Sequence, residues 1–230
     1  MMHALLCELE GVLFDTAALR REAMVRAIAS VGGTLPDEWR AAAGEPPIVP
    51  ADAAAAAAVA GLDADAPVSD LLGLTASRFF LEEASLGSVA LTDGAATFVS
   101  DATAQLRMVV VTRARRSEAD LLLSRSPFSD AFSFVIAEED TLHGKPHAGP
   151  YRAALDRLRS GPHGTTAALA LEHGAIGVAA AAAAGVRCIA VGPFEHMPGV
   201  SPAAAFPSLT ALSLSVLARF AELPEPGVVV

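Results

Sequence analysis

The fold is decided by residues 4–16, which read ALLCELEGVLFDT. In this stretch a short apolar run ends in two acids, Glu8 and Glu10, and Gly11 separates them from a second apolar run. Residues two apart in a strand share a face, so we expect both carboxylates to project together from the carboxyl end of a strand. Gly11 lets the backbone turn sharply and approach a ligand closely. Because half-buried paired carboxylates are costly unless they bind a cation or share a proton, the pattern indicates a binding site, with a solvated strand end as the simpler alternative.

The composition bounds the class of protein. The 230 residues are 53% hydrophobic and 18% charged, which is enough apolar content for one large domain or for a domain with a small insert. The formal net charge of −10 argues against nucleic-acid binding, because no basic stripe offsets it. Basic residues cluster locally at Arg113, Arg115 and Arg116.

The chain shows no apolar run long enough to span a membrane and no basic segment typical of a signal peptide. The two cysteines, Cys7 and Cys188, fall in expected strands and indicate core positions rather than a disulfide framework. We therefore expect a cytoplasmic protein without membrane contact. The expected assembly state is a monomer or homodimer.

Apolar strands alternate with helices along most of the chain. This alternation predicts an α/β fold with a Rossmann-like, doubly wound parallel sheet covered on both faces. Residues 16–89 contain no convincing strand and predict a helical insert, which leaves residues 1–15 and 90–230 as the core. After the first strand, the expected strands are residues 108–111, 132–136, 167–171 and 188–191, and the expected helices are residues 16–31, 51–60, 68–84, 95–106, 117–124, 150–158, 176–184 and 209–220.

In such a sheet, ligands bind beyond the carboxyl ends of the strands. Four separate segments of this chain place polar groups at that edge, and their convergence is the main evidence for a functional site. These groups are Glu8 and Glu10, Thr112 and Arg113, the loop that carries Lys145, and Glu172 and His173.

Lys145 stands out because the chain contains fifteen arginines and a single lysine. A lysine ammonium is a compact point charge, whereas arginine presents a wide planar fork. Gly144 and Pro146 on either side would fix the loop around it. The single lysine therefore indicates that position 145 requires a compact cation. The alternative is that Lys145 lies in an ordinary surface loop.

The order of these segments resembles the haloacid dehalogenase superfamily, in particular its small-helical-cap branch of phosphoglycolate phosphatase-like and beta-phosphoglucomutase-like proteins. That branch opens with Asp-x-Asp-Gly-[Val/Thr]-Leu-x-Asp-[Ser/Thr], which residues 8–16 match except for the first two acids. The second motif, a Thr or Ser that ends a strand, corresponds to Thr112. Gly-Lys-Pro and the following Pro-Tyr correspond to residues 144–146 and 150–151, and the fourth motif corresponds to residues 172–185.

The resemblance implies an activity and a set of roles. It implies a phosphatase-type hydrolase that acts on a small phosphorylated metabolite with a divalent metal, and a helical cap over residues 16–89. The implied catalytic residues are Glu8 as nucleophile, Glu10 as general acid/base, Thr112 and Lys145. The implied substrate or phosphate contacts are Gly11, Thr112, Arg113 and Lys145, the implied metal ligands are Glu8, Glu10, Glu172 and His173, and candidate cap contacts are Arg20, Arg21, Arg40, Glu45 and Arg78.

The departures from the family pattern lie at the positions to which the resemblance assigns catalysis and metal binding. Glu8, Glu10 and His173 stand where the family has aspartates, and each glutamate carries its carboxylate one methylene further out. A misplacement of about 1 Å can cost roughly a hundredfold in rate. Magnesium, the metal of the family, prefers oxygen ligands, so His173 opens the alternatives of manganese, zinc or another divalent metal. Arg20 stands where the phosphomutase-like pattern has a histidine.

Two hypotheses follow. The first, which we favour from the sequence, is a metal-dependent phosphatase-like hydrolase with a non-standard site. The second is a catalytically impaired member of the superfamily that binds inorganic phosphate or a phosphorylated metabolite or acts as a regulatory module. A dinucleotide-binding protein has little support, because Glu-x-Glu-Gly rather than Gly-x-Gly-x-x-Gly follows the first strand.

Overall fold

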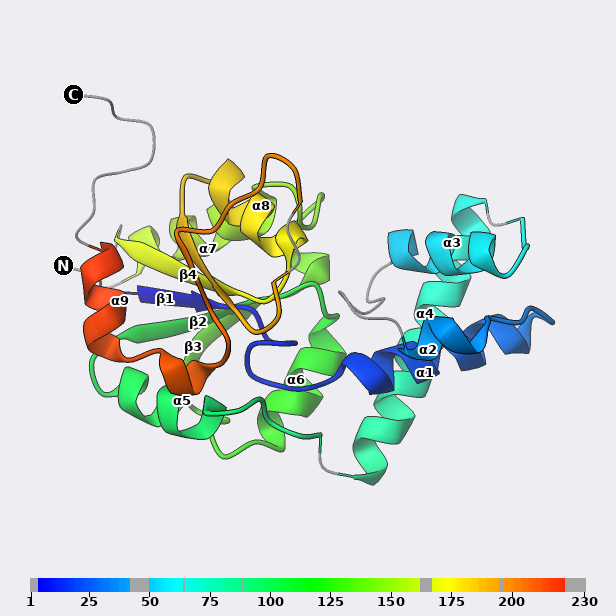
Figure 1. Cartoon of the computed structure of the whole chain (residues 1–230), viewed down its shortest axis with the longest axis horizontal. Helices are drawn as coiled ribbons and strands as arrows, with labels where there is room; N and C mark the ends of the chain where they lie inside the picture. The colour runs from blue at the N-terminus through cyan, green and yellow to red at the C-terminus, as the bar shows by residue number, and fades with distance from the viewer. Residues whose placement is uncertain are drawn as a thin grey trace.

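The computed structural model describes residues 4–41, 50–63, 65–87, 89–161, 167–194 and 197–221. Its centre is a six-stranded sheet, all parallel, with the strand order β3-β2-β1-β4-β5-β6 (Figure 1). This arrangement confirms the predicted α/β doubly wound sheet. The strands are β1 (Ala4–Cys7), β2 (Arg107–Val111), β3 (Phe132–Ile136), β4 (Ala168–Glu172), β5 (Arg187–Val191) and β6 (Ala204–Phe206).

Helices cover both faces of the sheet because the central strands are apolar on both sides. In β1, Leu5 and Cys7 pack with the helices α5 (Ala95–Thr103), α6 (Arg116–Ser124) and α9 (Leu214–Ala221). Ala4 and Leu6 alternate with them and pack on the opposite side, with α7 (Gly149–Ser160) and α8 (Ala175–Ala183). Figure 1 shows α7 and α8 above the strands and α5 and α6 below them.

Between β1 and β2 the chain forms α1 (Ala17–Ser30), α2 (Asp37–Ala41), α3 (Pro50–Val59) and α4 (Ala66–Leu86), here called the helical insert. The insert has its own hydrophobic cluster, which includes Met24, Ile28, Ala57 and Leu72. Figure 1 shows it beside the sheet, with α6 as the neighbouring core helix. The described residues of 16–89 contain no strand, whereas the domain boundaries at residues 15 and 90 stay a prediction.

The carboxyl end of α4 is tied to the core by Arg125. Its Nη1 donates to the carbonyl oxygens of Ala84 at 2.8 Å and Ser85 at 2.6 Å. These are carbonyls that lack partners within the helix, so the guanidinium satisfies acceptors that the helix end leaves open. Among the described residues, no helix is both long enough and apolar enough to cross a bilayer.

Three local features differ from the sequence expectations. The strand β6 was not predicted, because Ala-Ala-Phe lacks the β-branched residues that favour strands. The last helix begins at Leu214 rather than at residue 209, since the hydroxyl of Ser213 accepts from Val216 N at 3.4 Å and caps it there. Thr16 belongs to the expected helix 16–31, but α1 begins after it, and the Thr16 side chain donates to Glu10 rather than capping the helix.

Candidate active site

Lys145 lies at the centre of the polar groups at the carboxyl edge of the sheet. Its Nζ donates to Glu8 Oε2 at 2.8 Å, to the carbonyl oxygen of Val111 at 2.7 Å and to Glu172. The side chain is fully buried. Segments that end β1, β2 and β4 therefore meet around a single ammonium group, which is the convergence that the strand order predicts.

Strand pairing places the two acids. β1 and β4 are neighbours in register, with Cys7 opposite Leu171, so Glu8 and Glu172 occupy the next position on adjacent strands. The backbone N–H of Glu8 continues the ladder by donating to Leu171 O at 2.9 Å. Parallel strands thus bring residues 8 and 172 to the same edge, where the loop before α7 supplies Lys145.

The pKa values around Lys145 are set by burial and by an excess of negative charge. Burial alone would lower the pKa of Lys145, but Glu172 and Glu8 more than offset it and raise the pKa. Burial, reinforced by the charge of Glu8, raises the pKa of Glu172 to about 7 although Lys145 acts in the opposite direction. Tyr151, the only tyrosine of the chain, donates its hydroxyl to Glu172, and burial holds the pKa of Tyr151 well above its usual value.

Glu8 uses both of its carboxylate oxygens within the protein. Oε1 accepts from the backbone N–H of Leu9 at 2.7 Å, and Oε2 accepts from Lys145. The extra methylene lets the carboxylate of Glu8 fold back over the next amide of its own chain. An N–H group at the edge of the sheet, of the kind that binds anions, is therefore occupied by Glu8 itself.

Glu10 has different partners from Glu8. The strand ends at Cys7, and the chain then turns through Gly11, whose φ is +77°. The expectation that strand geometry projects Glu8 and Glu10 together is therefore wrong. Glu10 instead accepts from Thr16 Oγ1 at 2.6 Å, from Arg20 Nε at 2.9 Å and from Arg20 Nη2 at 2.5 Å.

Arg20 also binds a second acid, Glu118 of α6. Nη1 and Nη2 of Arg20 donate to the two oxygens of Glu118 at 2.7 and 2.9 Å. Burial would raise the pKa of Glu118, but Arg20 lowers it overall. Likewise, burial would lower the pKa of Arg20, while Glu10 and Glu118 raise it. Sequence reasoning missed Glu118, since nothing in the sequence separates it from other acids in the first turn of a helix.

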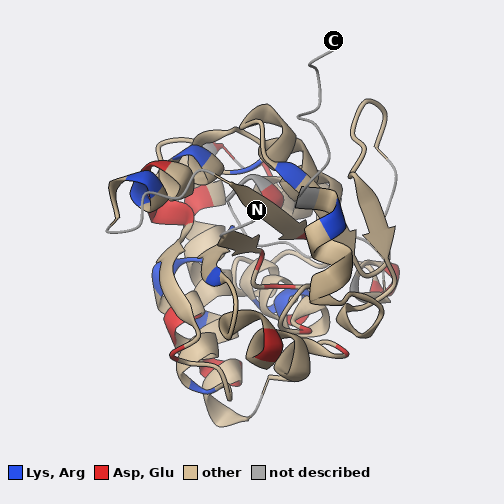
Figure 2. Cartoon of the chain, turned by 90° about the vertical axis from the view of Figure 1, so that its left-hand side faces the viewer, with Lys and Arg blue, Asp and Glu red and all other residues tan. Residues whose placement is uncertain are grey.

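Thr112 and Arg113 follow β2 at the same edge. Thr112 is buried, and its Oγ1 accepts from Ala114 N at 3.1 Å. Arg113 Nη2 forms a 2.6 Å ion pair with Asp52 of α3. The neighbouring arginines of the basic cluster are also paired, Arg115 with Glu138 and Arg116 with Asp140. Figure 2 likewise shows basic and acidic residues interspersed on the face drawn.

His173 packs against two glycines. A Cβ at Gly11 would lie 2.4 Å from His173 Cγ, and a Cβ at Gly192 would lie 2.8 Å from His173 Nδ1. Nδ1 lies 3.1 Å from the carbonyl oxygen of Val191, so this nitrogen carries the proton and donates. Among the described residues, His173 makes no hydrogen bond to Glu8 or Lys145, and its ring serves to fill the space beside the Gly11 turn.

The candidate metal ligands make contacts with other groups of the protein. The described residues contain no group of three or more His, Cys, Asp or Glu side chains placed to hold a metal ion. Glu8 is bound by Leu9 N–H and Lys145, and Glu172 is bound by Lys145 and Tyr151. The donors as they stand do not fit a divalent cation. Metal binding by Glu8, Glu10, Glu172 and His173 stays a prediction, and it requires these side chains to leave their present partners.

The other candidate contacts in the insert are largely engaged as well. Arg21 is buried, and Arg78 pairs with Glu82 of the same helix at 2.6 Å. The side chain of Arg40 and all of Glu45 lie outside the described residues. Arg20 contacts the core, through Glu10 and Glu118.

Comparison with known proteins gives consistent matches. The family model described as haloacid dehalogenase-like hydrolase matches residues 77–191. The protein CbbY of Rhodobacter capsulatus is 31% identical over 164 residues, which cover 70% of each chain. The crystal structure of CbbY from Rhodobacter sphaeroides in complex with phosphate has 26% identity and a TM-score of 0.76, and the match covers 95% of this chain and 100% of that one.

A more distant match bears on the metal of related folds. The HAD-hydrolase YfnB from Bacillus subtilis, solved bound to magnesium, has 19% identity and a TM-score of 0.67, covering 96% of this chain and 99% of that one. At this identity the likeness shows the fold alone.

Proposed function

Because the chain belongs to the haloacid dehalogenase-like hydrolase family, we propose that it binds inorganic phosphate or a small phosphorylated metabolite without the metal-dependent turnover typical of that family. The proposed binding site is the carboxyl edge of the sheet around Lys145 and Thr112. The observation that carries the proposal is the engagement of both carboxylate oxygens of Glu10 by Arg20 and Thr16.

The engagement of Glu10 opposes acid/base chemistry. A general acid or base must come within hydrogen-bond reach of the proton that it transfers. Glu10 is buried, and its ion pair with Arg20 is 2% exposed on both sides. Breaking a buried ion pair leaves an uncompensated charge, which is strongly unfavourable. Glu10 is therefore held as a partner of Arg20 rather than as a proton donor to a substrate.

The groups around Lys145 support anion binding. A phosphate oxygen can take the place of the Glu8 carboxylate at the N–H of Leu9, with the Lys145 ammonium and the Thr112 hydroxyl as further donors. Lys145 is the only lysine of the chain and lies where three strand ends meet. The phosphate complex of the 26% identical CbbY supports the same class of ligand.

A second candidate function is a metal-dependent phosphatase, and the 2.8 Å contact between Lys145 and Glu8 favours it. In that function Glu8 attacks phosphorus, the bond to the leaving oxygen breaks as Glu10 protonates that oxygen, and water then hydrolyses the acyl phosphate on Glu8. The phosphatase function requires Glu10 to break its ion pair with Arg20, and it requires the carboxylates of the candidate metal ligands to reach a cation. The observed contacts support neither change.

Turnover and binding assays on the same preparation separate the two functions. Hydrolysis of p-nitrophenyl phosphate is measured with Mg²⁺, Mn²⁺, Co²⁺, Ni²⁺ and Zn²⁺ for the wild type and for Glu8→Ala. We expect no metal to raise the wild-type rate above that of the variant. In a thermal-shift series, inorganic phosphate is expected to raise the melting temperature of the wild type and to do so less in Thr112→Val.

The proposal fails if any of the five metals supports hydrolysis that Glu8→Ala abolishes. It also fails if phosphate leaves the melting temperature unchanged at every concentration. Circular dichroism of each variant checks that the fold is retained.

A further inference from the structure

The guanidinium of Arg20 connects parts of the chain that are far apart in sequence. Arg20 belongs to α1 of the insert, whereas its two carboxylate partners, Glu10 and Glu118, belong to the core. All three guanidinium nitrogens donate, so each carboxylate is bound through both of its oxygens. A planar guanidinium matches carboxylates in this two-point manner, which fixes geometry as well as adding energy.

The surroundings of this contact add a second helix of the insert. The Cζ atom of Arg20 lies 3.6 Å from the ring centroid of Phe80 on α4, which makes a cation–π contact. Ser77, one turn earlier on α4, hydrogen-bonds to Glu118. The side chains of Arg20 and Glu118 are 2% and 0% exposed, so water does not screen their attraction. Two helices of the insert and two segments of the core therefore meet around one cation.

A second ion pair joins the insert to the core near the proposed phosphate site. Arg113 follows Thr112 at the end of β2 and pairs with Asp52 of α3 at 2.6 Å. The Arg113 side chain is 6% exposed and that of Asp52 is 25% exposed. This contact holds α3 next to the carboxyl edge of the sheet, so α1, α3 and α4 are each tied to the core by polar side chains.

We propose that the Glu10–Arg20–Glu118 network is a conformational lock that holds the insert closed over the edge of the sheet. Lids over enzyme sites generally close on their substrate. In this chain the closing contacts are made by its own side chains, so a ligand reaches Lys145 and Thr112 only after the network opens. The identity of that ligand rests on the proposed function, whereas the lock itself rests on the contacts of Arg20.

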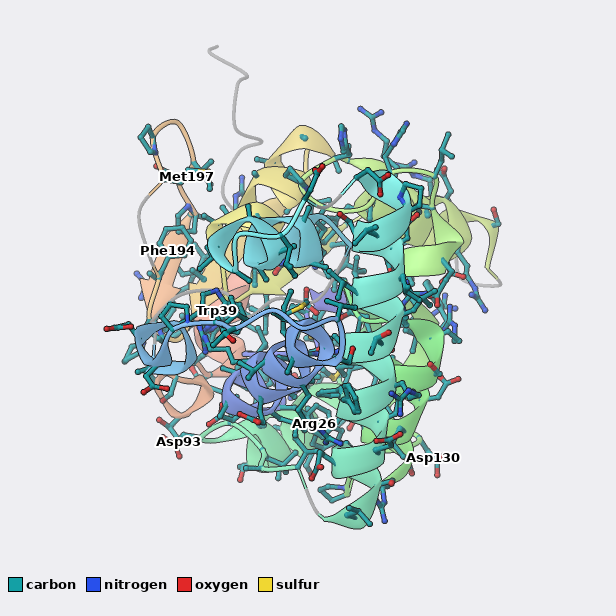
Figure 3. All side chains as sticks on the ribbon, turned by 90° about the vertical axis from the view of Figure 1, so that its right-hand side faces the viewer. Arg26, Trp39, Asp93, Asp130, Phe194 and Met197 are labelled. Atoms are coloured by element: carbon teal, nitrogen blue, oxygen red, sulfur yellow. The ribbon has the colours of Figure 1, made fainter. Side chains whose placement is uncertain are left out.

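Arg26 provides a matched control on the same helix. It pairs with Glu83 at 2.6 Å, and its Cζ lies 4.1 Å from the ring of Phe79, so it combines an ion pair with a cation–π contact as Arg20 does, but within the insert and with 34% of its side chain exposed. Figure 3 labels Arg26 beside α1 and α4. A lock at Arg20 predicts that the two arginines differ in their effect on the position of the insert. If Arg20 contributes only to stability, neither variant moves the insert away from the core.

The test measures the distance between insert and core with spin labels. Cysteines that carry the labels replace Leu71 on α4, which is 57% exposed, and Ser100, which is exposed on α5. The lock variant combines Arg20→Met, Glu10→Gln and Glu118→Gln, which removes the ion pairs without leaving a lone buried charge. We expect one narrow distance distribution in the wild type and in Arg26→Met, and an added population at longer distance in the lock variant.

An unchanged distribution in the folded lock variant overturns the proposal, as does an equal change in Arg26→Met. If the triple variant does not fold, Glu118→Gln alone is used, since Arg20 and Glu10 still neutralise each other. That variant is expected to broaden the distribution, and an unchanged one again overturns the lock. Wild-type hydrolysis in the metal assay would reject the proposed function and leave the distance result standing, so the two failures are distinguishable.

Discussion

The Nη2 atom of Arg20 lies 2.5 Å from Oε1 of Glu10, in an ion pair whose side chains are both 2% exposed. The family resemblance places a general acid/base at Glu10 and a histidine at position 20. An arginine that cannot lose its proton in a protein stands there instead, next to a carboxylate that is one methylene longer. This pair joins a candidate site residue of the core to α1 of the helical insert.

Removal of the Arg20 guanidinium is expected to be costly. In Arg20→Met, Glu10 and Glu118 remain buried without their cation, so we expect a loss of about 3–5 kcal/mol in the free energy of unfolding. Urea denaturation measures the loss. Arg26→Met, which removes a partly exposed pair, should cost at most about 1 kcal/mol. Equal losses of unfolding free energy in the two variants would show that Arg20 is not needed to compensate the buried charges of Glu10 and Glu118.

Restoration of the family residues should return activity only if Arg20 changes too. The variant Glu8→Asp, Glu10→Asp, His173→Asp still faces the Arg20 guanidinium. Adding Arg20→His is expected to raise magnesium-dependent hydrolysis of p-nitrophenyl phosphate by about a hundredfold or more, the usual contribution of a freed general acid or base. The measurement is kcat for both variants. A triple variant as active as the quadruple one would mean that Arg20 does not restrain residue 10.

The raised pKa of Glu172 makes stability depend on pH. Burial and the charge of Glu8 raise that pKa from 4.5 to about 7. The contribution of Glu172 to stability is therefore full below pH 4.5, where this carboxyl is protonated in both the folded and the unfolded chain, and it is lost as pH rises through about 7. In Glu172→Gln this loss, up to about 3 kcal/mol for a fully buried group, should be absent.

Unfolding by urea between pH 4 and pH 8 gives the measurement, with the exposed Glu38→Gln as control. The wild type and Glu38→Gln should lose stability in parallel over this window, while Glu172→Gln stays flatter. Parallel curves for all three proteins would contradict the assignment to Glu172.

The contact between His173 and Gly11 gives a steric prediction. Gly11 and Gly32 have similar φ values, +77° and +83°, but a Cβ at Gly32 meets nothing within 4 Å. Gly32→Ala should therefore cost only the backbone term, about 1–2 kcal/mol. Gly11→Ala should cost roughly 1–3 kcal/mol more because of the clash with the imidazole ring.

A double-mutant cycle with His173→Ala isolates that clash. The extra cost of Gly11→Ala over Gly32→Ala should disappear in the His173→Ala background. If it persists there, the ring of His173 does not occupy the space beside Gly11.

The sequence predicted most of the sheet and its helices, since strands such as residues 188–191 are apolar runs that end at a clear breaker, here Gly192 and Pro193. It placed Glu8, Glu172 and Lys145 at one edge because parallel strands end together. β6 was not predicted, because its pairing with β5 rather than its composition makes it a strand. Elements with a clear local hydrophobic pattern could thus be predicted from the sequence, whereas an element that forms only by pairing with a neighbouring strand could not.

The network around Arg20 could not be predicted in the same way. Arg20 and Glu118 are 98 positions apart, and the sequence around a charged helical residue does not indicate which distant residue it pairs with. The orientation of His173 likewise depends on Gly192, which follows β5. Both features arise when separate elements pack together, so only the folded chain shows them.

The central claim, binding without turnover, is tested most directly by ³¹P NMR of p-nitrophenyl phosphate mixed with the wild-type protein and Mg²⁺. The account predicts that the signal of the phosphate ester broadens with protein concentration, broadens less with Thr112→Val, and yields no growing signal of inorganic phosphate. A phosphate signal that grows with the wild type and not with Glu8→Ala would contradict the account, as would an ester signal that the protein leaves sharp.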